Sequence, residues 1–528
     1  MELHEALALR LTGPQLANDP LSLAETPPSF TGYEKNFTFD SKYHRVVPRF
    51  PNPVRLTILA IGLALARAGL VNPKRVRRTT DLAWPRIVTG LARMSKNAVD
   101  VAFVGIAVGP AAIAGVGFAS PYWGIAFSLG GGFAGGTIAL VSQRYGAGAF
   151  DELGQAIRSS AALVLAVTLP VACLFWLFPT ELISLMTGNE TTVEMGATYL
   201  QILAIGVPFA GLNLIGSRIY IGMDDSWTPM LVRSGGAISN IVLSGLLVFP
   251  LGWGVAGAAW GTVLANVVVT AAFALGLVAG RLPIAGELPV QVNPAAKYVD
   301  GDTIRQLVHI GLPVVGRNMV WTVAKFPMLA IVALFGQNVV AAYVISRRIW
   351  GLMNTPGWGF GLASSSLVGQ ELGAGNELDA EEYARDVILF AVATYAVAAV
   401  IVFAFAEPIA VSFVGDSADP SVVPHTVALV YAACAAVMAQ GVKGAAAGPL
   451  DASGDTRWPF YSQIIGMFGC AIPVAYLGAT TSLGLMGLYL SFVAETTVPA
   501  AINYHRFSTG RWKAISRKFR PGVSASDD

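Results

Sequence analysis

The sequence predicts an all-α integral membrane protein in which twelve transmembrane helices form two six-helix lobes. Three observations lead to this fold class: the composition, twelve apolar stretches of membrane-spanning length, and an internal repeat. Hydrophobic residues make up 54% of the 528 residues, charged residues make up 12%, and the mean hydropathy is +0.60. A soluble chain carries about a quarter charged residues, so the composition alone predicts a membrane protein.

Twelve apolar stretches are each long enough to cross the roughly 30 Å hydrocarbon core of a bilayer as a helix. Helices are expected because no water is present in that core to satisfy exposed peptide groups. The spans of the first half are expected at 85–108, 111–142, 154–177, 195–222, 227–250 and 254–279. The spans of the second half are expected at 308–335, 339–370, 385–406, 422–448, 458–478 and 484–504.

Residues at the span boundaries recur in the second half of the chain. The stretch from Pro85 ends in Ser-Gln and Gly-Ala-Gly within 142–148, and the stretch from Pro313 ends in Gly-Gln and Gly-Ala-Gly within 369–375. Because six spans is an even number, both halves enter the membrane in the same orientation, which predicts parallel repeats with a cavity between them. Further pairs lie 230 positions apart: Asp225 and Asp455, Pro229 and Pro459, Gly254 and Gly484, and Gly257 and Gly487.

Lysine and arginine are distributed asymmetrically over the connections between the spans. Every second connection, beginning with 109–110 and ending with 479–483, contains neither residue. The opposite side carries Arg144, Arg281 and Lys297, and basic residues also precede the first span and follow the last one. By the positive-inside rule, this distribution predicts a multi-pass protein of the cell membrane with both termini in the cytoplasm.

Composition divides the chain into six segments. Residues 1–53 form a polar N-terminal extension without a membrane span or a signal-peptide pattern, and 54–80 are expected to form an interfacial helix and a basic linker. The other segments are an N-lobe at 81–280, a cytoplasmic inter-lobe linker at 281–307, a C-lobe at 308–505 and a basic cytoplasmic tail at 506–528.

Several of these motifs together resemble the multidrug and toxic compound extrusion (MATE) family, and within it the DNA-damage-inducible prokaryotic branch. They are Val99-Asp100 with Phe103-Val104-Gly105 in the first span, and the duplicated Gln and Gly-Ala-Gly endings. The resemblance covers about 80–510. It implies a V-shaped pair of lobes with a central cavity that opens alternately to either side. It also implies export of amphipathic compounds, driven by protons or sodium, without any other cofactor.

Asp100 is the candidate cation-coupling residue, because it matches the acidic residue that family members carry in the first helix. A buried carboxylate can bind a proton from one side of the membrane and release it to the other. The alternative is a plain salt bridge, since Lys96 and Arg93 stand four and seven residues earlier on the same helix face. The two interpretations are compatible, because protonation of Asp100 would free the lysine.

The fifth helix departs from the pattern that the resemblance implies. The branch carries Asn-x-x-x-Asp there, whereas this chain has Asn240 and Ser244, and a serine cannot carry a proton at neutral pH. Thr262 in the sixth helix is a further candidate for the wall of the coupling site. Trp321 and Gln440 occupy the positions nearest to the carboxylates of the sodium-coupled branch, so Asp100 is the one familiar coupling carboxylate that this sequence keeps.

The second lobe has more predicted basic than acidic residues within its spans. Glu495 is the one acid in the middle of a span, against five cations: Arg317, Lys325, Arg347, Arg348 and Lys443. Arg347 is interpreted as structural. Lys325 either pairs with Glu495 or with free carbonyls at a helix break, or it serves as the counter-charge of an anionic substrate. Spare positive charge would repel cations, which favours small organic substrates that are anionic, zwitterionic or lipid-like.

A flippase and an enzyme are the two alternatives to an antiporter. A lipid or lipid-linked oligosaccharide flippase shares the architecture and would use extra cations to bind pyrophosphate. An enzyme is not expected, because the sequence has neither His-Glu-x-x-His nor Gly-x-Ser-x-Gly. The 34 basic and 32 acidic residues nearly balance, so nucleic acid is not expected as a partner. Membrane lipids are expected partners, the chain is expected to be a monomer, and its cysteines predict neither a disulfide framework nor a metal site.

Overall fold

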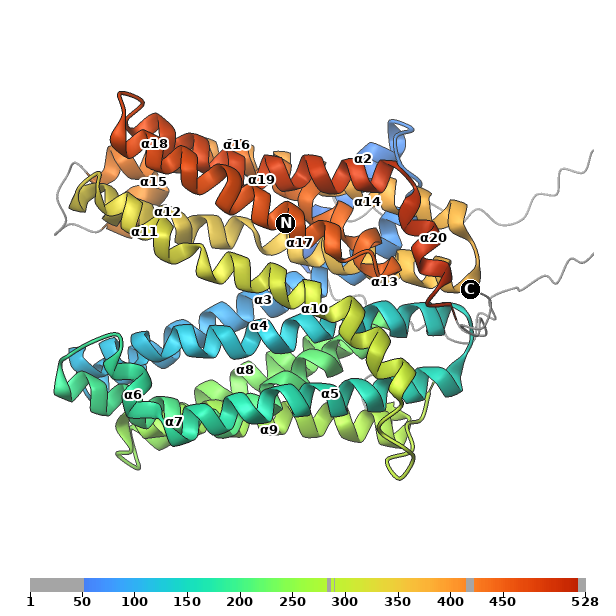
Figure 1. Ribbon diagram of the computed structural model, residues 1–528, viewed down its shortest axis with the longest axis horizontal. Helices are drawn as coiled ribbons and strands as arrows, with labels where there is room; N and C mark the ends of the chain where they lie inside the picture. Colours follow the sequence, from blue (N-terminus) through green and yellow to red (C-terminus); the bar gives the residue numbers. More distant parts are fainter. Residues whose placement is uncertain (1–51, 283–285, 289, 415–421, 521–528) are drawn as a thin grey trace, which may run out of the picture. The chain divides into compact units, whose positions relative to one another are not determined.

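The computed structural model describes residues 52–282, 286–288, 290–414 and 422–520, all within one compact unit that extends from Val46 to Asp528. The predicted N-terminal extension lies outside the described residues up to position 51. The described part is almost entirely helical, and Figure 1 shows its long helices in two bundles. This arrangement confirms the predicted all-α membrane fold.

The N-lobe contains six long helices joined by short connections. A short helix, α6 (Pro179–Ser184), lies between the predicted spans 154–177 and 195–222, and α2 (Pro53–Arg67) precedes the lobe. The long helices are α3 (Pro73–Ala107), α4 (Pro110–Gly146), α5 (Phe150–Leu177), α7 (Glu190–Gly222), α8 (Trp227–Val248) and α9 (Gly254–Ala279).

The C-lobe follows the same order, but three of its spans are divided. They are α10 (Gly301–Val323) with α11 (Lys325–Ala333), α12 (Gln337–Met353) with α13 (Thr355–Ala374), and α17 (Arg457–Ile464) with the π-helix η2 (Ile465–Ala471) and α18 (Ile472–Thr480). The undivided helices are α14 (Glu377–Ala404), α16 (Val422–Ser453) and α19 (Leu485–Ser508), with α15 (Ala406–Val414) in a connection and α20 (Arg511–Arg517) after the lobe. Strands β1 (Arg281–Leu282) and β2 (Gly286–Glu287) pair in the inter-lobe linker.

Ten segments of the described chain are long and apolar enough to cross a membrane. The other two predicted spans correspond to α3, which contains several charged side chains, and to the α12–α13 pair, which is interrupted at Asn354. Pro356 stands in the first turn of α13, where a proline does not remove a helical hydrogen bond.

Two helices begin about two to three turns before the predicted spans. The side chain of Asn72 caps α3 by accepting from the backbone nitrogen of Lys74 at 2.9 Å, so the predicted basic linker is helical and Pro85 lies inside the helix. Asp300 caps α10 in the same way and accepts from Thr303. The hydrogen bonds from Thr303 hold the pKa of Asp300 below its usual value. The repeated prolines therefore mark the helix interior and not its start.

The duplicated Gln and Gly-Ala-Gly endings lie where the two lobes cross. A Cβ atom at Gly146 of α4 would overlap the backbone carbonyl of Gln370 on α13, and one at Gly373 would overlap the carbonyl of Gln143. The contact is therefore reciprocal and backbone to backbone. Gln143 also donates across the lobes to the carbonyl of Ala452 at 2.6 Å. Glycine is required in both endings because neither helix leaves room for a side chain.

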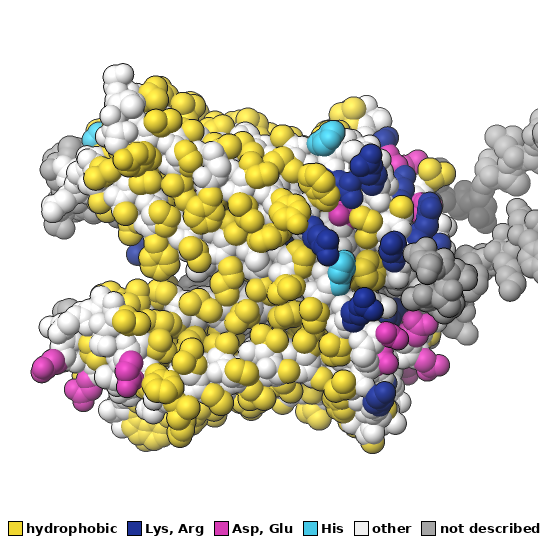
Figure 2. Space-filling model, viewed as in Figure 1, with side chains coloured by type: hydrophobic (Ala, Val, Ile, Leu, Met, Phe, Trp, Pro, Cys, Tyr) yellow, Lys and Arg dark blue, Asp and Glu magenta, His cyan; other side chains and the backbone are white. Residues whose placement is uncertain are grey.

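Charged residues gather at the end of the bundle where the lobes meet, which we call the basic end. Arg75 and Arg78 of α3 bind acids there, including an ion pair of 3.2 Å between Arg78 and Asp224. The described part of the predicted C-terminal tail packs at this end, where Trp512 of α20 is buried and stacks on Phe507. Figure 2 shows the basic side chains concentrated at this end and a gap between the lobes at the opposite end.

Candidate functional site

The carboxylate of Asp100 lies inside the N-lobe and is surrounded by donors from three helices. Asp100 is 4% exposed. Its Oδ2 lies 3.3 Å from Nζ of Lys96, one turn earlier on α3, and 3.4 Å from Oγ1 of Thr262 on α9. Lys96 Nζ also lies 3.4 Å from Thr262 Oγ1. Burial of a charged group requires such partners, and this carboxylate has both a counter-charge and hydrogen-bond donors.

Asn240 of α8 bridges Asp100 and Thr262. With its nitrogen toward the carboxylate, the amide donates to Oδ1 of Asp100 at 3.0 Å and to Oδ2 at 3.2 Å. The amide oxygen then accepts from Oγ1 of Thr262 at 3.0 Å. The opposite orientation would place the amide oxygen against the carboxylate oxygens, so this is the orientation that pairs donors with acceptors. The Thr262 hydroxyl has a single proton to donate, to either Asp100 or Asn240.

Two further hydroxyl groups border this site, which we call the Asp100 site. Ser244 of α8 is fully buried and lies near the carboxylate, but its Oγ meets hydrogen-bond geometry with no group in the described chain. Tyr199 of α7 is 8% exposed and lies within electrostatic range of both Asp100 and Thr262. Tyr199 lies on a fourth helix and belongs to no motif, so it could not be predicted from the sequence.

The arrangement allows the carboxylate to exist in two charge states. When Asp100 is ionised, Lys96 and Asn240 satisfy it, and when it is protonated, its own O–H can donate to a neighbouring oxygen such as that of Ser244 or Thr262. The side chain of Lys96, which is 19% exposed, would then be free to move its ammonium away from the carboxylate. The structure therefore brings together five of the predicted site residues: Asp100, Lys96, Asn240, Ser244 and Thr262.

Arg93 does not join this site, although it shares a helix face with Lys96 and Asp100. Its guanidinium lies 5.3 Å from the ring centroid of Phe127 and 5.1 Å from that of Trp358, on the other lobe. The salt bridge considered for Asp100 therefore involves Lys96 and not Arg93. Arg93 is seven residues from Asp100, about two turns along α3, and its long side chain extends toward the aromatic rings.

Two of the five C-lobe cations are paired with acids. Arg347 of α12 binds Glu495 of α19 through two hydrogen bonds, at 2.9 and 3.2 Å. Arg317 of α10 binds Asp451 of α16 in the same bidentate manner, at 3.1 and 2.9 Å. Asp451 was not counted because the predicted tenth span ended at 448, whereas α16 continues to Ser453. The excess of buried positive charge in this lobe is therefore smaller than expected: Lys325 and Arg348 are exposed, and Lys443 of α16 is half-buried and forms no ion pair within the described residues.

The remaining C-lobe candidates lie apart from these pairs. Lys325 begins α11, directly after the break in the seventh span, and its ammonium lies 4.1 Å from the ring centroid of Trp321. Lys325 is exposed on the chain and does not pair with Glu495, because Arg347 occupies both carboxylate oxygens. Gln440 of α16 is 9% exposed. No described contact connects it to the Asp100 site.

The Arg347–Glu495 pair is expected to stabilise the C-lobe. Removing one partner of a buried ion pair costs about 3–5 kcal/mol. The lower value applies to Glu495→Gln because the Arg347 side chain is 17% exposed. We expect Glu495→Gln to lower the thermal unfolding midpoint of the purified protein in detergent, and Arg347→Met/Glu495→Gln to recover most of the loss. Glu407→Gln, at an exposed acid, is the control, and an equal midpoint for the two glutamine variants would contradict a structural pair.

The chain is a multi-pass helical membrane protein of the transporter class. Three features define this class: the duplicated bundle, the buried carboxylate in one lobe and the reciprocal contact between the lobes. The chain belongs to the MatE family, whose model matches it twice, at residues 85–246 and 313–477. The two matches confirm the internal repeat and the family resemblance. Because this is a transporter family, the prediction that the chain is not an enzyme is also confirmed.

Individual relatives are distant but extend over most of the chain. Multidrug resistance protein PmpM of Pseudomonas aeruginosa is 27% identical over 83% of this chain and 91% of its own length. The probable multidrug resistance protein YoeA of Bacillus subtilis is 22% identical over 80% of this chain and 90% of its own length. An outward-facing MATE family transporter has a TM-score of 0.77 at 21% identity, over 84% of this chain and 96% of its own. A MOP superfamily transporter from Pyrococcus furiosus has a TM-score of 0.77 at 22% identity, over 83% and 96%.

Proposed function

We propose that this protein exports amphipathic organic compounds across the cell membrane by alternating access, in exchange for protons that bind Asp100. The observation that carries this proposal is the placement of one buried carboxylate among Lys96, Asn240 and Thr262, from three helices of a single lobe. An ionisable residue at membrane depth is costly and marks an ion pathway. The curated relatives named above are multidrug resistance proteins, which supports export of organic compounds.

The geometry favours a proton over sodium as the coupling ion. A sodium ion at Asp100 Oδ2 would lie close to the ammonium of Lys96, which is 3.3 Å from that oxygen. Two positive charges at such a distance inside a protein repel each other strongly. A proton avoids this conflict, because protonation of Asp100 neutralises the carboxylate and releases Lys96 instead of competing with it.

The orientation of the chain in the membrane follows from the charge distribution. We propose that the basic end faces the cytoplasm, in accordance with the positive-inside rule, and that both termini lie on that side. In that orientation the gap between the lobes in Figure 2 opens to the outside. We further propose that the chain acts as a monomer, and we place it in the DNA-damage-inducible branch because Asn240 is kept in the fifth helix.

Transport into everted membrane vesicles tests the proposal when the two ion gradients are imposed separately. Uptake of a fluorescent substrate such as ethidium or rhodamine 6G should follow an imposed pH gradient and should not respond to a sodium gradient at constant pH. Uptake that follows sodium alone would overturn the proton assignment. A lipid flippase remains the second candidate, and accumulation of a lipid-linked intermediate in a deletion strain, without any change in drug sensitivity, would favour it.

A further inference from the structure

Four arginines converge inside the N-lobe, at a distance from the Asp100 site. Arg86 and Arg93 lie on α3, Arg218 lies on α7 and Arg233 lies on α8, and we call them the arginine cluster. Arg218, Arg233 and Arg93 are all close enough to Arg86 for their charges to repel it. Arg218 and Arg93 likewise repel Arg233. Within the described part of the chain, no carboxylate forms an ion pair with any of the four.

The burial of this cluster is unusual for unpaired cations. Arg86 is 8% exposed, and its Nε has no hydrogen-bond partner in the described residues. The other three arginines are half-buried. Arg233 donates weakly to the carbonyl of Asn213 at 3.5 Å, and Arg86 and Arg93 lie 5.8 and 5.1 Å from the ring centroid of Trp358. Burying charge without a counter-ion is costly, so such a cluster indicates that an external anion supplies the missing charge.

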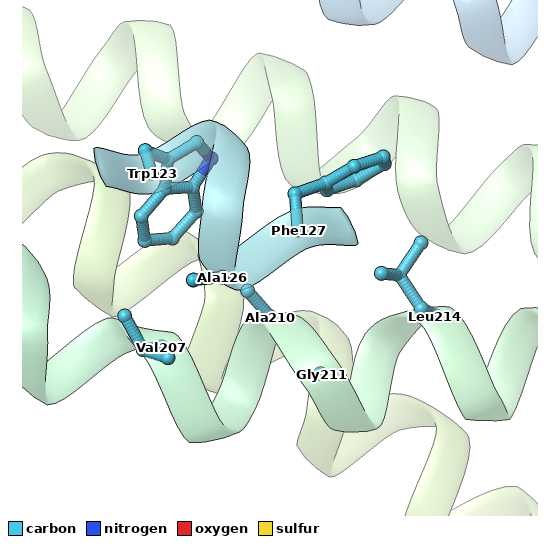
Figure 3. Close-up of a pocket in the computed structure, with 7 residues that line it drawn as sticks. All are labelled: Trp123, Ala126, Phe127, Val207, Ala210, Gly211 and Leu214. Carbon is cyan, nitrogen blue, oxygen red and sulfur yellow. The ribbon is translucent and has the colours of Figure 1, made fainter. Parts of the chain in front are cut away.

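An apolar pocket adjoins the cluster. Phe127 belongs to both, since its ring faces the guanidinium of Arg93 at 5.3 Å and also lines the pocket. Helix α7 connects them as well, because Leu214 of the pocket stands one turn before Arg218. Figure 3 shows the rings of Trp123 and Phe127 opposite the side chains from α7. The complete lining is Trp123, Ala126, Phe127, Val207, Ala210, Gly211 and Leu214.

We propose that the arginine cluster binds the phosphate or carboxylate head group of an anionic amphipath, while the apolar pocket holds the beginning of its hydrocarbon chain. Guanidinium groups bind these oxyanions through paired, charge-assisted hydrogen bonds, and several of them can share one phosphate. This inference deepens the proposed function by naming a substrate class. It also relocates the positive charge that recognises an anion, from the C-lobe, where the cations are largely paired or exposed, to the N-lobe.

Equilibrium binding to the purified full chain in a non-ionic maltoside micelle tests this proposal by calorimetry. The probes are decyl phosphate, decyltrimethylammonium and inorganic phosphate. We expect decyl phosphate to bind at least about tenfold more tightly than either of the others, because only decyl phosphate has both the charge and the tail. Arg86→Gln and Arg218→Gln should each weaken decyl phosphate binding by about tenfold or more, the effect of one charge-assisted hydrogen bond.

Arg348→Gln is the matched control, since it removes an exposed arginine from the C-lobe and should leave all three affinities unchanged. Arg86→Gln and Arg218→Gln should not lower the thermal unfolding midpoint, because each removes a buried charge that has no partner. If these arginines were purely structural, the same substitutions would lower the midpoint. Equal affinities for decyl phosphate and decyltrimethylammonium, or equal effects of Arg86→Gln and Arg348→Gln, would overturn the proposal.

Competition by phosphatidic acid distinguishes the source of the anion. If phosphatidic acid displaces decyl phosphate, the ligand is a lipid, and if it does not, the ligand is a soluble anionic amphipath. Because these measurements need no ion gradient, their failure would leave proton coupling at Asp100 untouched. Conversely, a failure of coupled transport would leave this binding site intact.

Discussion

Asp100→Asn is expected to abolish substrate accumulation driven by a pH gradient. Asparagine keeps the size of the side chain and its hydrogen-bond acceptor, but it cannot exchange a proton. A gradient of two pH units is worth about 2.7 kcal/mol per proton, enough to sustain a substrate gradient of about a hundredfold. In the variant the accumulation ratio should fall to about one. Everted vesicles with an imposed pH gradient and a fluorescent substrate measure this directly.

A loss of the fold must be separated from a loss of coupling in this experiment. Asp100→Asn leaves Lys96 without its counter-charge, which is destabilising even though the lysine is partly exposed. The double variant Lys96→Gln/Asp100→Asn removes both charges and should restore the thermal midpoint without restoring accumulation. If the double variant accumulates substrate as the unmodified protein does, Asp100 is a partner in a salt bridge and not the coupling residue.

The helices could be predicted because hydropathy and charge asymmetry are local properties of the sequence. The predicted spans 227–250 and 254–279 agree closely with α8 and α9. The helix start at Pro73 was missed because Pro85 was taken as the first residue of a span, although neighbouring helices tolerate a proline inside one. The start at Gly301 was missed because the seventh span was predicted from its apolar residues alone, beginning at 308. The reciprocal contact of Gly146 and Gly373 depends on how the lobes approach each other, and the repeat alone gives no information about that.

The charged sites show the limit of sequence reasoning more clearly. Lys96 and Asp100 are one turn apart on a single helix, so their contact could be predicted from helical spacing. The arginine cluster joins residues of three helices that are up to 147 positions apart in the chain, and no spacing rule connects Arg86 with Arg233. Asp451 was missed because the predicted tenth span ended at 448, whereas α16 continues to Ser453. Which residues pair across different helices can therefore be read only from the three-dimensional structure.

Gly146→Ala is expected to prevent the lobes from closing at the basic end. The added methyl group would overlap the carbonyl of Gln370, which belongs to the backbone and cannot rotate away as a side chain could. Overpacking of this kind costs about 1–3 kcal/mol or more, which shifts a two-state equilibrium by about five- to 150-fold or more. Transport should fall by a similar factor, because alternating access requires both states. Gly373→Ala should have the same effect through the carbonyl of Gln143.

Distances between spin labels at Glu190 and Ser412, measured by double electron–electron resonance in a cysteine-free background, distinguish a shifted equilibrium from misfolding. Both residues are exposed, and they lie on different lobes at the end opposite the basic residues. If closure at the basic end separates the lobes at the other end, Gly146→Ala must shorten this distance. Gly124→Ala, on the same helix with open space around its Cβ, should change neither the distance nor transport. Identical behaviour of the two alanine variants would show that the glycine contact does not control which side is open, and that another part of the interface between the lobes does.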